Sequence, residues 1–296
     1  MNIINFGSLN IDHVYSVSHL AVPGETVASD KLEIFYGGKG FNQSIAAARA
    51  GAHVIHIGKI GENGIPLKEF LQRNNVDVDL ILTSDAPNGH AIIQVDRMGQ
   101  NNIITYGGAN YKIDKEQVSS ALDVGTRGDI ILLQNEISGI GYIIEQAHLH
   151  GFQVAFNPSP ITKDIMKYPL QYVKWFILNE IEGQKLTGET DPSSIAEKLL
   201  QMYPESTVIL TLGSKGVLYK DSSTTLQHGT YKVDRVDTTG AGDTFTGYFI
   251  AGITKNFSPG ECLEFASIAS SITVSRKGAA VSIPTIKEVK RANLKI

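Results

Sequence analysis

The segment Asp237–Phe245, Asp-Thr-Thr-Gly-Ala-Gly-Asp-Thr-Phe, joins a glycine-rich turn to an acidic residue at the start of an amphipathic pattern. The glycines allow a bend in which the N–H groups of Gly240, Ala241 and Gly242 point at one spot, and a helix beginning there adds partial positive charge. This arrangement suits a phosphoryl group in transfer. Phosphate repels a carboxylate, so Asp243 is interpreted as a base that accepts the proton of an attacking hydroxyl. The alternative is an ordinary capped helix with an aspartate in its first turn.

A second glycine-rich stretch, Gly37–Gln43, opens another predicted helix. It lacks the spacing of a Walker A loop, and it precedes rather than follows a strand, which excludes a dinucleotide-binding fingerprint. Lys39 and Asn42 lie one turn apart and could bind the hydroxyls of a polyol. A tight turn into a packed helix accounts for the same glycines.

Polar residues also follow several apolar runs, at the points where predicted strands end. They are Asn10 and Asp12, Asn135 and Glu136, Asn157, and Asn179. In an open α/β sheet these ends converge on one crevice, and amide and carboxylate groups there suit a hydroxyl-rich ligand and a hydrated Mg²⁺. The segment Thr211–Gly216 joins two strands and by itself reads as a β-turn. No His-Glu-x-x-His, Gly-x-Ser-x-Gly or clustered metal-ligand spacing occurs.

The elements that position these residues alternate between short β-branched runs and longer helical patterns. Strands are predicted at 2–6, 53–58, 129–134, 153–157, 175–179 and 207–213, and helices at 40–50, 66–74, 115–123, 139–150, 180–186, 192–202, 241–254 and 259–274. This alternation predicts an α/β fold, in which helices cover both faces of a mostly parallel sheet in three layers.

Two stretches break the alternation. Residues 10–36 contain two extended segments joined across Pro23-Gly24, and residues 88–106 read as a β-hairpin. We expect both to form a small β-sheet lid over the strand ends, inserted in a single domain that spans 1–296. An exposed sheet of this kind has edges and an apolar face to cover, which favours a homodimer formed through the lid.

The composition is that of a globular protein, with 42% hydrophobic and 19% charged residues. A net charge of −4 and the absence of a basic stripe argue against nucleic acid or an anionic membrane as a partner. The single cysteine, Cys262, fits a reducing compartment. The first residues show no leader signature, and no apolar run reaches the roughly 18 residues of a membrane span, so we expect a cytoplasmic protein.

Taken together, these segments resemble the ribokinase branch of the PfkB-type carbohydrate kinases over nearly the whole chain. The matching pieces are Gly7–His13, Pro23–Thr26, Gly37–Gln43, Gly107–Asn110, Asn157–Pro160, Asn179–Glu182, Leu186–Gly188, Thr211–Gly216, Asp237–Phe245 with Gly247, and Arg276–Ala279. The order of the paired-glycine and Gly-Ala-Gly-Asp elements is specific to this family. The chain departs from the family pattern at Asn63 and Pro66, and at Ser267, where a larger polar residue is frequent.

The resemblance implies a role for each matching residue. The sugar is held by Asn10, Asp12, Gly38, Lys39, Asn42 and Glu136, with Asp243 as the base and Gly240, Ala241 and Gly242 as the anion hole. ATP is bound by Asn179, Thr211, Gly213, Ser214, Lys215, Gly216, Gly242 and Ser267. Glu182 belongs to an Asn-x-x-Glu pair associated with Mg²⁺ through water. An activating K⁺ is implied at Asp237, Thr239, Thr273, Arg276, Gly278 and Ser282.

The resemblance therefore implies transfer of the γ-phosphoryl group of MgATP to a sugar hydroxyl. The sugar-site residues favour ribose, while fructose, deoxyribose or an adenosine-like nucleoside stays open because a few lid residues can decide the preference. A non-catalytic sugar sensor of the same fold is a second hypothesis, and retention of Asp243 speaks against it. A nicotinamide-dependent oxidoreductase has only the α/β pattern in its favour.

Overall fold

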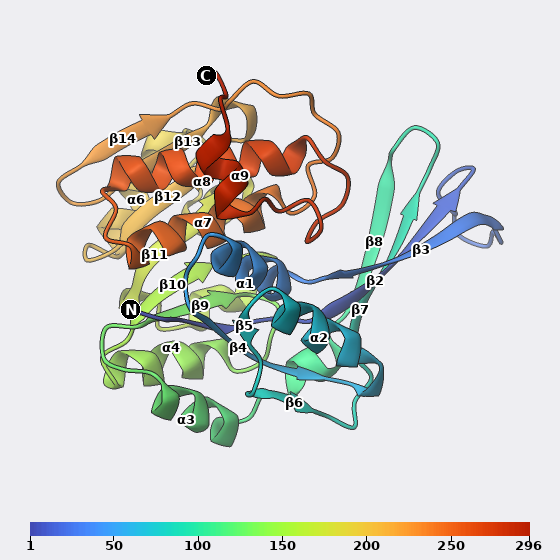
Figure 1. Cartoon of the computed structure of the whole chain (residues 1–296), viewed down its shortest axis with the longest axis horizontal. Coiled ribbons are helices and arrows are strands. Elements are labelled where there is room, and N and C mark those ends of the chain that lie inside the picture. The colour runs from blue at the N-terminus through green and yellow to red at the C-terminus, as the bar shows by residue number, and fades with distance from the viewer.

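The computed structural model describes all residues 1–296 and contains two separate sheets (Figure 1). The larger sheet comprises β1 (Ile3–Phe6), β4 (Val54–Ile60), β5 (Val76–Asp77), β6 (Ile81–Thr83), β9 (Ile130–Gln134), β10 (Gln153–Asn157), β11 (Val173–Asn179), β12 (Thr207–Thr211), β13 (Val217–Lys220) and β14 (Thr225–His228). Its order is β14-β13-β12-β11-β10-β9-β1-β4-β5, and β6 pairs with β4. Only the β12–β13 and β13–β14 pairs are antiparallel.

Helices cover both faces of this sheet, as predicted. They are α1 (Lys39–Arg49), α2 (Ile65–Arg73), α3 (Lys115–Val124), α4 (Ile140–Leu149), α5 (Glu180–Thr187), α6 (Pro192–Met202), α7 (Ala241–Thr254), α8 (Pro259–Val274) and α9 (Ile286–Arg291). Figure 1 shows α1, α7 and α8 on one side of the sheet and α3 and α4 on the other. Consecutive residues of a strand point to opposite faces, so Ile3 belongs to the core under α1 and α7, and Ile4 to the core under α3 and α4.

Local capping explains where several helices begin. Ser258 accepts from the backbone of Glu261 while the Glu261 carboxylate accepts from the backbone of Ser258, which makes a capping box before α8. Asp191 caps α6 in the same position, ahead of Pro192 at the first helical residue. These signals are local in sequence, and the predicted starts of α6 and α8 are confirmed.

The smaller sheet, called the lid below, comprises β2 (Asn10–Val17), β3 (Ser29–Gly37), β7 (Gly89–Val95) and β8 (Asn101–Tyr106), in the order β3-β2-β7-β8. It projects from the body of the molecule (Figure 1). β2 follows β1 after three residues, and β3 leads directly into α1. Sugar-site candidates at the start of β2 and the start of α1 therefore lie where the lid joins the body.

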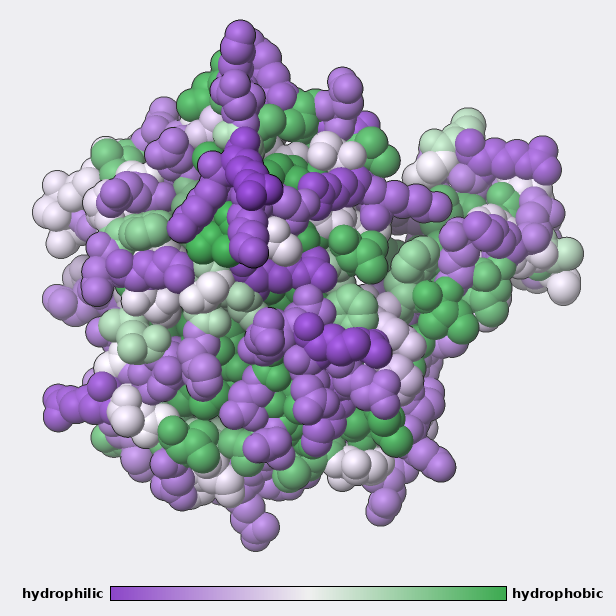
Figure 2. All heavy atoms as spheres, in the orientation of Figure 1, coloured by the Kyte–Doolittle hydropathy of each residue, from purple (hydrophilic) through white to green (hydrophobic).

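Hydrophobic side chains are exposed on the projecting sheet, as Figure 2 shows. The strand register aligns Ile34 of β3, His13 of β2, Ile92 of β7 and Ile104 of β8 in one row across the lid. Ile34 is 56% exposed and Ile104 67% exposed. Because side chains alternate along a strand, this row lies on the face opposite to that of Asp12.

The edges of the large sheet hold elements that periodicity did not predict. β5 and β6 have only two and three residues, and β14 pairs with β13 at the far edge. Strands this short carry too few alternations to show a pattern, and pairing with a longer neighbour defines them. No helix of the structure has the length and apolar character needed to cross a membrane.

Candidate active site

Asp243 lies in the first turn of α7 with 9% of its surface exposed. Two amide side chains of α1 donate to its carboxylate: Asn42 Nδ2 to Oδ2 at 3.0 Å, and Gln43 Nε2 to Oδ1 at 2.9 Å. The two helices must approach closely for these contacts. Gly247 allows this approach, since a Cβ there would lie 2.4 Å from Cβ of Ala46. The packing of α1 on α7 therefore fixes both oxygens of Asp243.

The turn before α7 leaves backbone N–H groups free beside this carboxylate. Gly240 adopts φ of 75°, a left-handed conformation that favours glycine. The amide of Ala241 donates to the carbonyl of Thr238 at 3.3 Å, whereas the amides of Gly240, Gly242 and Asp243 donate to no group of the chain. A Cβ at Gly242 would meet nothing within 4 Å. Of the three amides predicted to bind an anion, two are free, and the amide of Asp243 is a third.

Residues predicted to bind the sugar come together where the lid meets the body. Glu136 Oε2 accepts from Ser8 Oγ and, at 2.9 Å, from the backbone N–H of Lys39. Asn10 Oδ1 accepts from Asn110 Nδ2 at 2.8 Å. Gly38, at the N-terminal end of α1, has φ of 97°, and a Cβ there would lie 3.0 Å from the carbonyl oxygen of Ser8. The paired glycines thus let the chain pass close to the end of β1.

The charges of this group influence one another. Burial, and secondly the charge of Glu136, raise the pKa of Asp12 to about 6. Burial also raises the pKa of Glu136, against the opposing effects of Lys39 and of its hydrogen bonds. For Lys39, burial alone lowers the pKa, but the charges of Asp243, Glu136 and Glu182 outweigh it and the net shift is upward. A buried ammonium therefore stays charged among three carboxylates.

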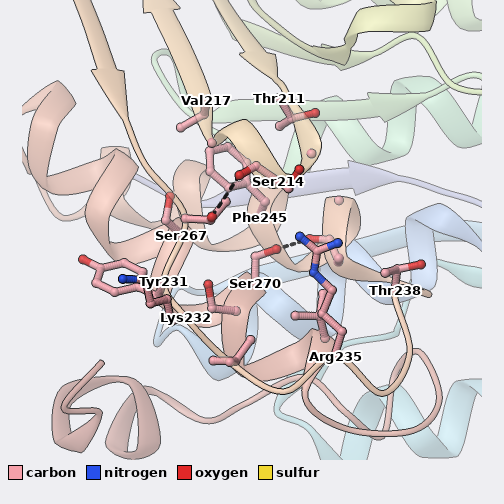
Figure 3. Close-up of a pocket in the computed structure, with 18 residues that line it drawn as sticks. Thr211, Ser214, Val217, Tyr231, Lys232, Arg235, Thr238, Phe245, Ser267 and Ser270 are labelled. Atoms are coloured by element: carbon pink, nitrogen blue, oxygen red, sulfur yellow. Dashed lines mark hydrogen bonds between the residues drawn. The ribbon is translucent and has the colours of Figure 1, made fainter. Parts of the chain in front are cut away.

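A cavity of about 470 Å³ opens beside the start of α7 (Figure 3). Its lining includes Thr211, Gly213, Ser214 and Gly216 from the β12–β13 turn, Ser267 and Ser270 from α8, and the apolar Val217, Phe245 and Val274. Of the residues in the Thr211–Gly216 segment and α8 that were predicted to bind ATP, all but one line this cavity. Lys215 is exposed and does not line the cavity.

A second cavity, of about 240 Å³, lies over the carboxylate of Asp243. Lys39, Asn157, Asn179, Glu182 and Thr246 are among its lining residues. The two cavities share Thr211, Thr238 and Gly242, so they meet at the turn with the free amides. Asn10, Asp12 and Glu136 line neither cavity and lie farther toward the lid.

The Asn-x-x-Glu pair has a structural role that the sequence reading did not identify. Asn179 Oδ1 accepts from the backbone N–H of Glu182 at 2.9 Å, and Glu182 Oε2 accepts from the backbone N–H of Asn179 at 3.0 Å. This capping box starts α5. The other oxygen of Glu182, Oε1, accepts no hydrogen bond from the chain and belongs to a residue that lines the second cavity. The pair can therefore cap α5 and still offer one carboxylate oxygen to a hydrated Mg²⁺.

The residues implied at a K⁺ site lie in two segments joined by Asp237. Its Oδ1 accepts from the backbone N–H of Thr239 and its Oδ2 from that of Gly278, both at 2.9 Å. Ser282 Oγ donates to the carbonyl of Ala279 at 2.6 Å. Both carboxylate oxygens are engaged, so backbone carbonyls are the ligands that these segments can offer to a cation.

The other two implied residues have partners of their own. The hydroxyl of Thr273 is fully buried and donates to Thr244 Oγ1 at 3.0 Å, while the Arg276 guanidinium pairs with Glu288 at 2.7 Å. The Thr273 side chain therefore helps to pack α8 against α7, and Arg276 ties the segment after α8 to α9.

Several residues of the site were not predicted. Gln43 contacts Asp243, Ser8 contacts Glu136, and Lys232 and Arg235 bring positive charge to the wall of the larger cavity. Figure 3 shows Arg235 between Ser270 and Thr238. Gln43 is the last residue of the glycine-rich motif Gly37–Gln43, so the sequence did indicate its proximity to the site. The two basic residues lie in an irregular segment whose path depends on tertiary packing.

The profile of the pfkB family carbohydrate kinases matches residues 2–286. This chain belongs to that family. The kinase is 35% identical over 301 residues to a ribokinase of Staphylococcus aureus (strain COL), with 98% of each chain covered. Its structure is similar to the crystal structure of a ribokinase from Thermotoga maritima, with a TM-score of 0.88, 34% identity and 98% of each chain covered.

A further similar structure is that of Arabidopsis thaliana ribokinase complexed with ribose and ATP, with a TM-score of 0.86 and 30% identity over 98% of this chain and 97% of that one. The family and these relatives confirm the predicted α/β fold with its small sheet, and the predicted enzyme class. The protein is an ATP-dependent carbohydrate kinase.

Proposed function

We propose that this kinase transfers the γ-phosphoryl group of MgATP to the terminal hydroxyl of ribose, giving ribose 5-phosphate and ADP. The observation that carries the proposal is the position of Asp243. Its carboxylate lies below the smaller cavity, next to free backbone amides, at the point where that cavity meets the larger one. The named relatives, which are ribokinases, support ribose as the acceptor.

The site provides the parts that the reaction needs. Asp243 accepts the hydroxyl proton as the sugar oxygen bonds to the γ-phosphorus and the bond from that phosphorus to the bridging oxygen of ADP breaks. The free amides of Gly240 and Gly242, together with the Lys39 ammonium, face the negative charge of the phosphoryl group. The nucleotide lies in the larger cavity, against the turn Thr211–Gly216 and α8.

The sugar lies between Asp243 and the lid, where Asn10, Asp12 and Glu136 supply acceptors for hydroxyls. Asn42 Oδ1 is buried and has no hydrogen-bond partner in the chain, so it can accept from a sugar hydroxyl. We expect the lid strands to hold Asp12 over this space and, when the lid is closed, to exclude water that could hydrolyse ATP.

Two metal ions belong to the proposal. Glu182, through water, would hold Mg²⁺, which neutralises charge on the phosphates of bound ATP. K⁺ would be held by carbonyls of the segments around Asp237 and Gly278, and there it adds fixed positive charge beside the free amides.

The proposal is tested by ATP consumption with ribose, deoxyribose, fructose and several nucleosides, with and without K⁺. Asp243→Asn is expected to lower kcat by about 10³-fold or more while leaving the KM for ATP within about twofold. Near-normal turnover by this variant refutes the role of the base. ATP consumption with none of these acceptors favours a sugar sensor instead.

We propose further that the protein is a cytoplasmic homodimer whose 296 residues form one domain, with the lid strands inserted. The exposed row of Ile34, Ile92 and Ile104 supports an interface on the outer lid face. Sedimentation analysis of Ile104→Lys, compared with the wild-type chain, tests this. A wild-type chain that sediments with the mass of one monomer refutes it.

A further inference from the structure

A line of fully buried amide side chains runs from Asp243 to the other side of α1. Gln43 Nε2 donates to Asp243 Oδ1 and, at 3.2 Å, to Asn157 Oδ1, while Gln43 Oε1 accepts from Gln134 Nε2 at 2.7 Å. Gln134 Nε2 also donates to Asn5 Oδ1 at 3.0 Å. Gln43 and Asn5 are completely buried and Gln134 is 1% exposed. An amide group has a donor end and an acceptor end, so each member constrains the orientation of the next.

His56, at the far end of this series of hydrogen bonds, determines which group donates and which accepts at each step. His56 Nε2 lies 3.2 Å from the carbonyl oxygen of Gly7, which can only accept, so Nε2 carries the proton of the ring. Burial lowers the pKa of His56 to about 4, which keeps the ring neutral and leaves Nδ1 as an acceptor. Ser44 Oγ lies 2.8 Å from Nδ1 and therefore donates to it. Ser44 Oγ in turn accepts from Asn5 Nδ2 at 2.7 Å.

Only one orientation of the Gln134 amide and one of the Gln43 amide match each donor in this series with an acceptor. Asn5 Nδ2 is also held by the carbonyl of Gly40 at 2.8 Å, so Asn5 Oδ1 must face Gln134. Gln134 then presents its NH₂ group to both Asn5 and Gln43. Gln43 must turn its oxygen to Gln134 and its NH₂ group to Asp243. The reverse orientation would place an oxygen of Gln43 against a carboxylate oxygen.

The chain keeps this arrangement although it leaves one group unsatisfied. Gln134 Oε1 is buried and has no hydrogen-bond partner. An apolar side chain of similar size would avoid that penalty but would leave Gln43 Oε1 and Asn5 Oδ1, which accept only from Gln134, without a donor. A glutamine is therefore required here for the two hydrogen bonds that it donates, one of which holds the amide oxygen of Gln43.

We propose that Gln43 and Gln134 are positioning residues for the base: Gln134 holds the oxygen of the Gln43 amide while Asn157 accepts from its NH₂ group, and Gln43 so oriented fixes one oxygen of Asp243 for proton transfer. This inference rests on the proposed role of Asp243. The line from His56 to Asp243 spans residues of β1, α1, β4, β9 and α7, so it ties the base to the centre of the main sheet.

Three variants test the inference in the full-length kinase, with ribose and ATP as substrates. Gln43→Leu removes the donor to Asp243 and is expected to lower kcat about tenfold or more, with the KM for ATP within twofold. Gln134→Glu introduces a carboxyl group that, once ionised, can only accept. To donate to this carboxylate, Gln43 must turn its NH₂ group away from both Asp243 and Asn157, so kcat should fall as the pH rises and the new carboxyl group ionises. Gln134→Met cannot reverse Gln43 and should show no such pH dependence.

Gln117 provides a matched control outside the site. It is 3% exposed on α3, donates from Nε2 to the carbonyls of Gly58 and Leu80, and also has a buried, unpaired Oε1. Gln117→Met should lower thermal stability as Gln134→Met does, and should leave kcat and its pH profile unchanged.

Two results overturn the inference. One is a kcat of folded Gln43→Leu within twofold of wild type, and the other is identical pH profiles for Gln134→Glu and Gln134→Met. If Gln43→Leu does not fold, the comparison of the two Gln134 variants decides by itself. If Asp243→Asn is inactive while Gln43→Leu is normal, only this inference fails. If Asp243→Asn is active, the proposed base itself is wrong.

Discussion

The buried His56 should make the free energy of unfolding of this kinase decrease at acidic pH. It lies on β4 with no exposed surface, accepts at Nδ1 from Ser44 and donates from Nε2 to the carbonyl of Gly7. A proton added at Nδ1 would point at a hydroxyl that already donates there. Burial lowers the pKa of His56 from 6.5 to about 4, with a smaller opposing effect of the Gly7 carbonyl.

The direction and size of this stability change follow from the pKa values of His56 in the unfolded and folded chain. The unfolded chain takes up this proton as the pH falls through about 6.5, whereas the folded chain resists it until about pH 4. The free energy of unfolding therefore keeps its full value above pH 6.5 and declines between pH 6.5 and 4. At 1.36 kcal/mol for each pH unit between the two values, the loss attributable to His56 is about 3 kcal/mol.

Urea unfolding at pH 7.5, 6, 5 and 4.5 measures this loss. His56→Gln can still accept from Ser44 and donate to Gly7 but does not titrate. The variant is expected to be less stable than wild type at pH 7.5, and that deficit should shrink by about 2 to 3 kcal/mol by pH 4.5. His53→Gln, at an exposed position three residues earlier, is the control and should keep a constant difference from wild type. A deficit of His56→Gln that does not change with pH refutes the reasoning.

Three further predictions concern the site. Gly242→Ala should fold with a melting temperature close to that of the wild-type chain, because a Cβ there meets no neighbouring atom within 4 Å. It should lose about 10²-fold or more in kcat because the methyl group fills space beside the free amides, and normal kinetics would contradict this. Arg235→Met should raise the KM for ATP severalfold with little change in the KM for ribose, and steady-state assays that find neither KM altered would exclude Arg235 from nucleotide binding. The KM for ribose should rise as the pH falls through about 6, because Asp12 gains a proton there and loses acceptor capacity. Asp12→Asn should show a high KM for ribose at every pH. A wild-type KM for ribose that does not change from pH 7.5 to 5 would count against a role of Asp12 in sugar binding.

Amino-acid sequence alone determined most of the helices and the inner strands of this protein, since their causes are local, but not the short edge strands β5, β6 and β14. The caps of α6 and α8 lie within a few residues of the helices that they start. Hydrophobic runs specify the inner strands, which are buried on both faces. The conformation of a glycine-rich turn depends on adjacent residues, so the position of Asp243 at a helix start could be predicted.

Tertiary structure alone decided which side chains meet, because contacts between distant residues depend on how whole helices pack. Gln43 reaches Asp243 across 200 residues of sequence, and Gln134 reaches Gln43 across 91. The same packing places Lys215 outside the larger cavity and Arg235 in its wall. The orientation of each buried amide depends on a hydrogen-bonded neighbour from another element, and no local pattern in the sequence encodes that dependence.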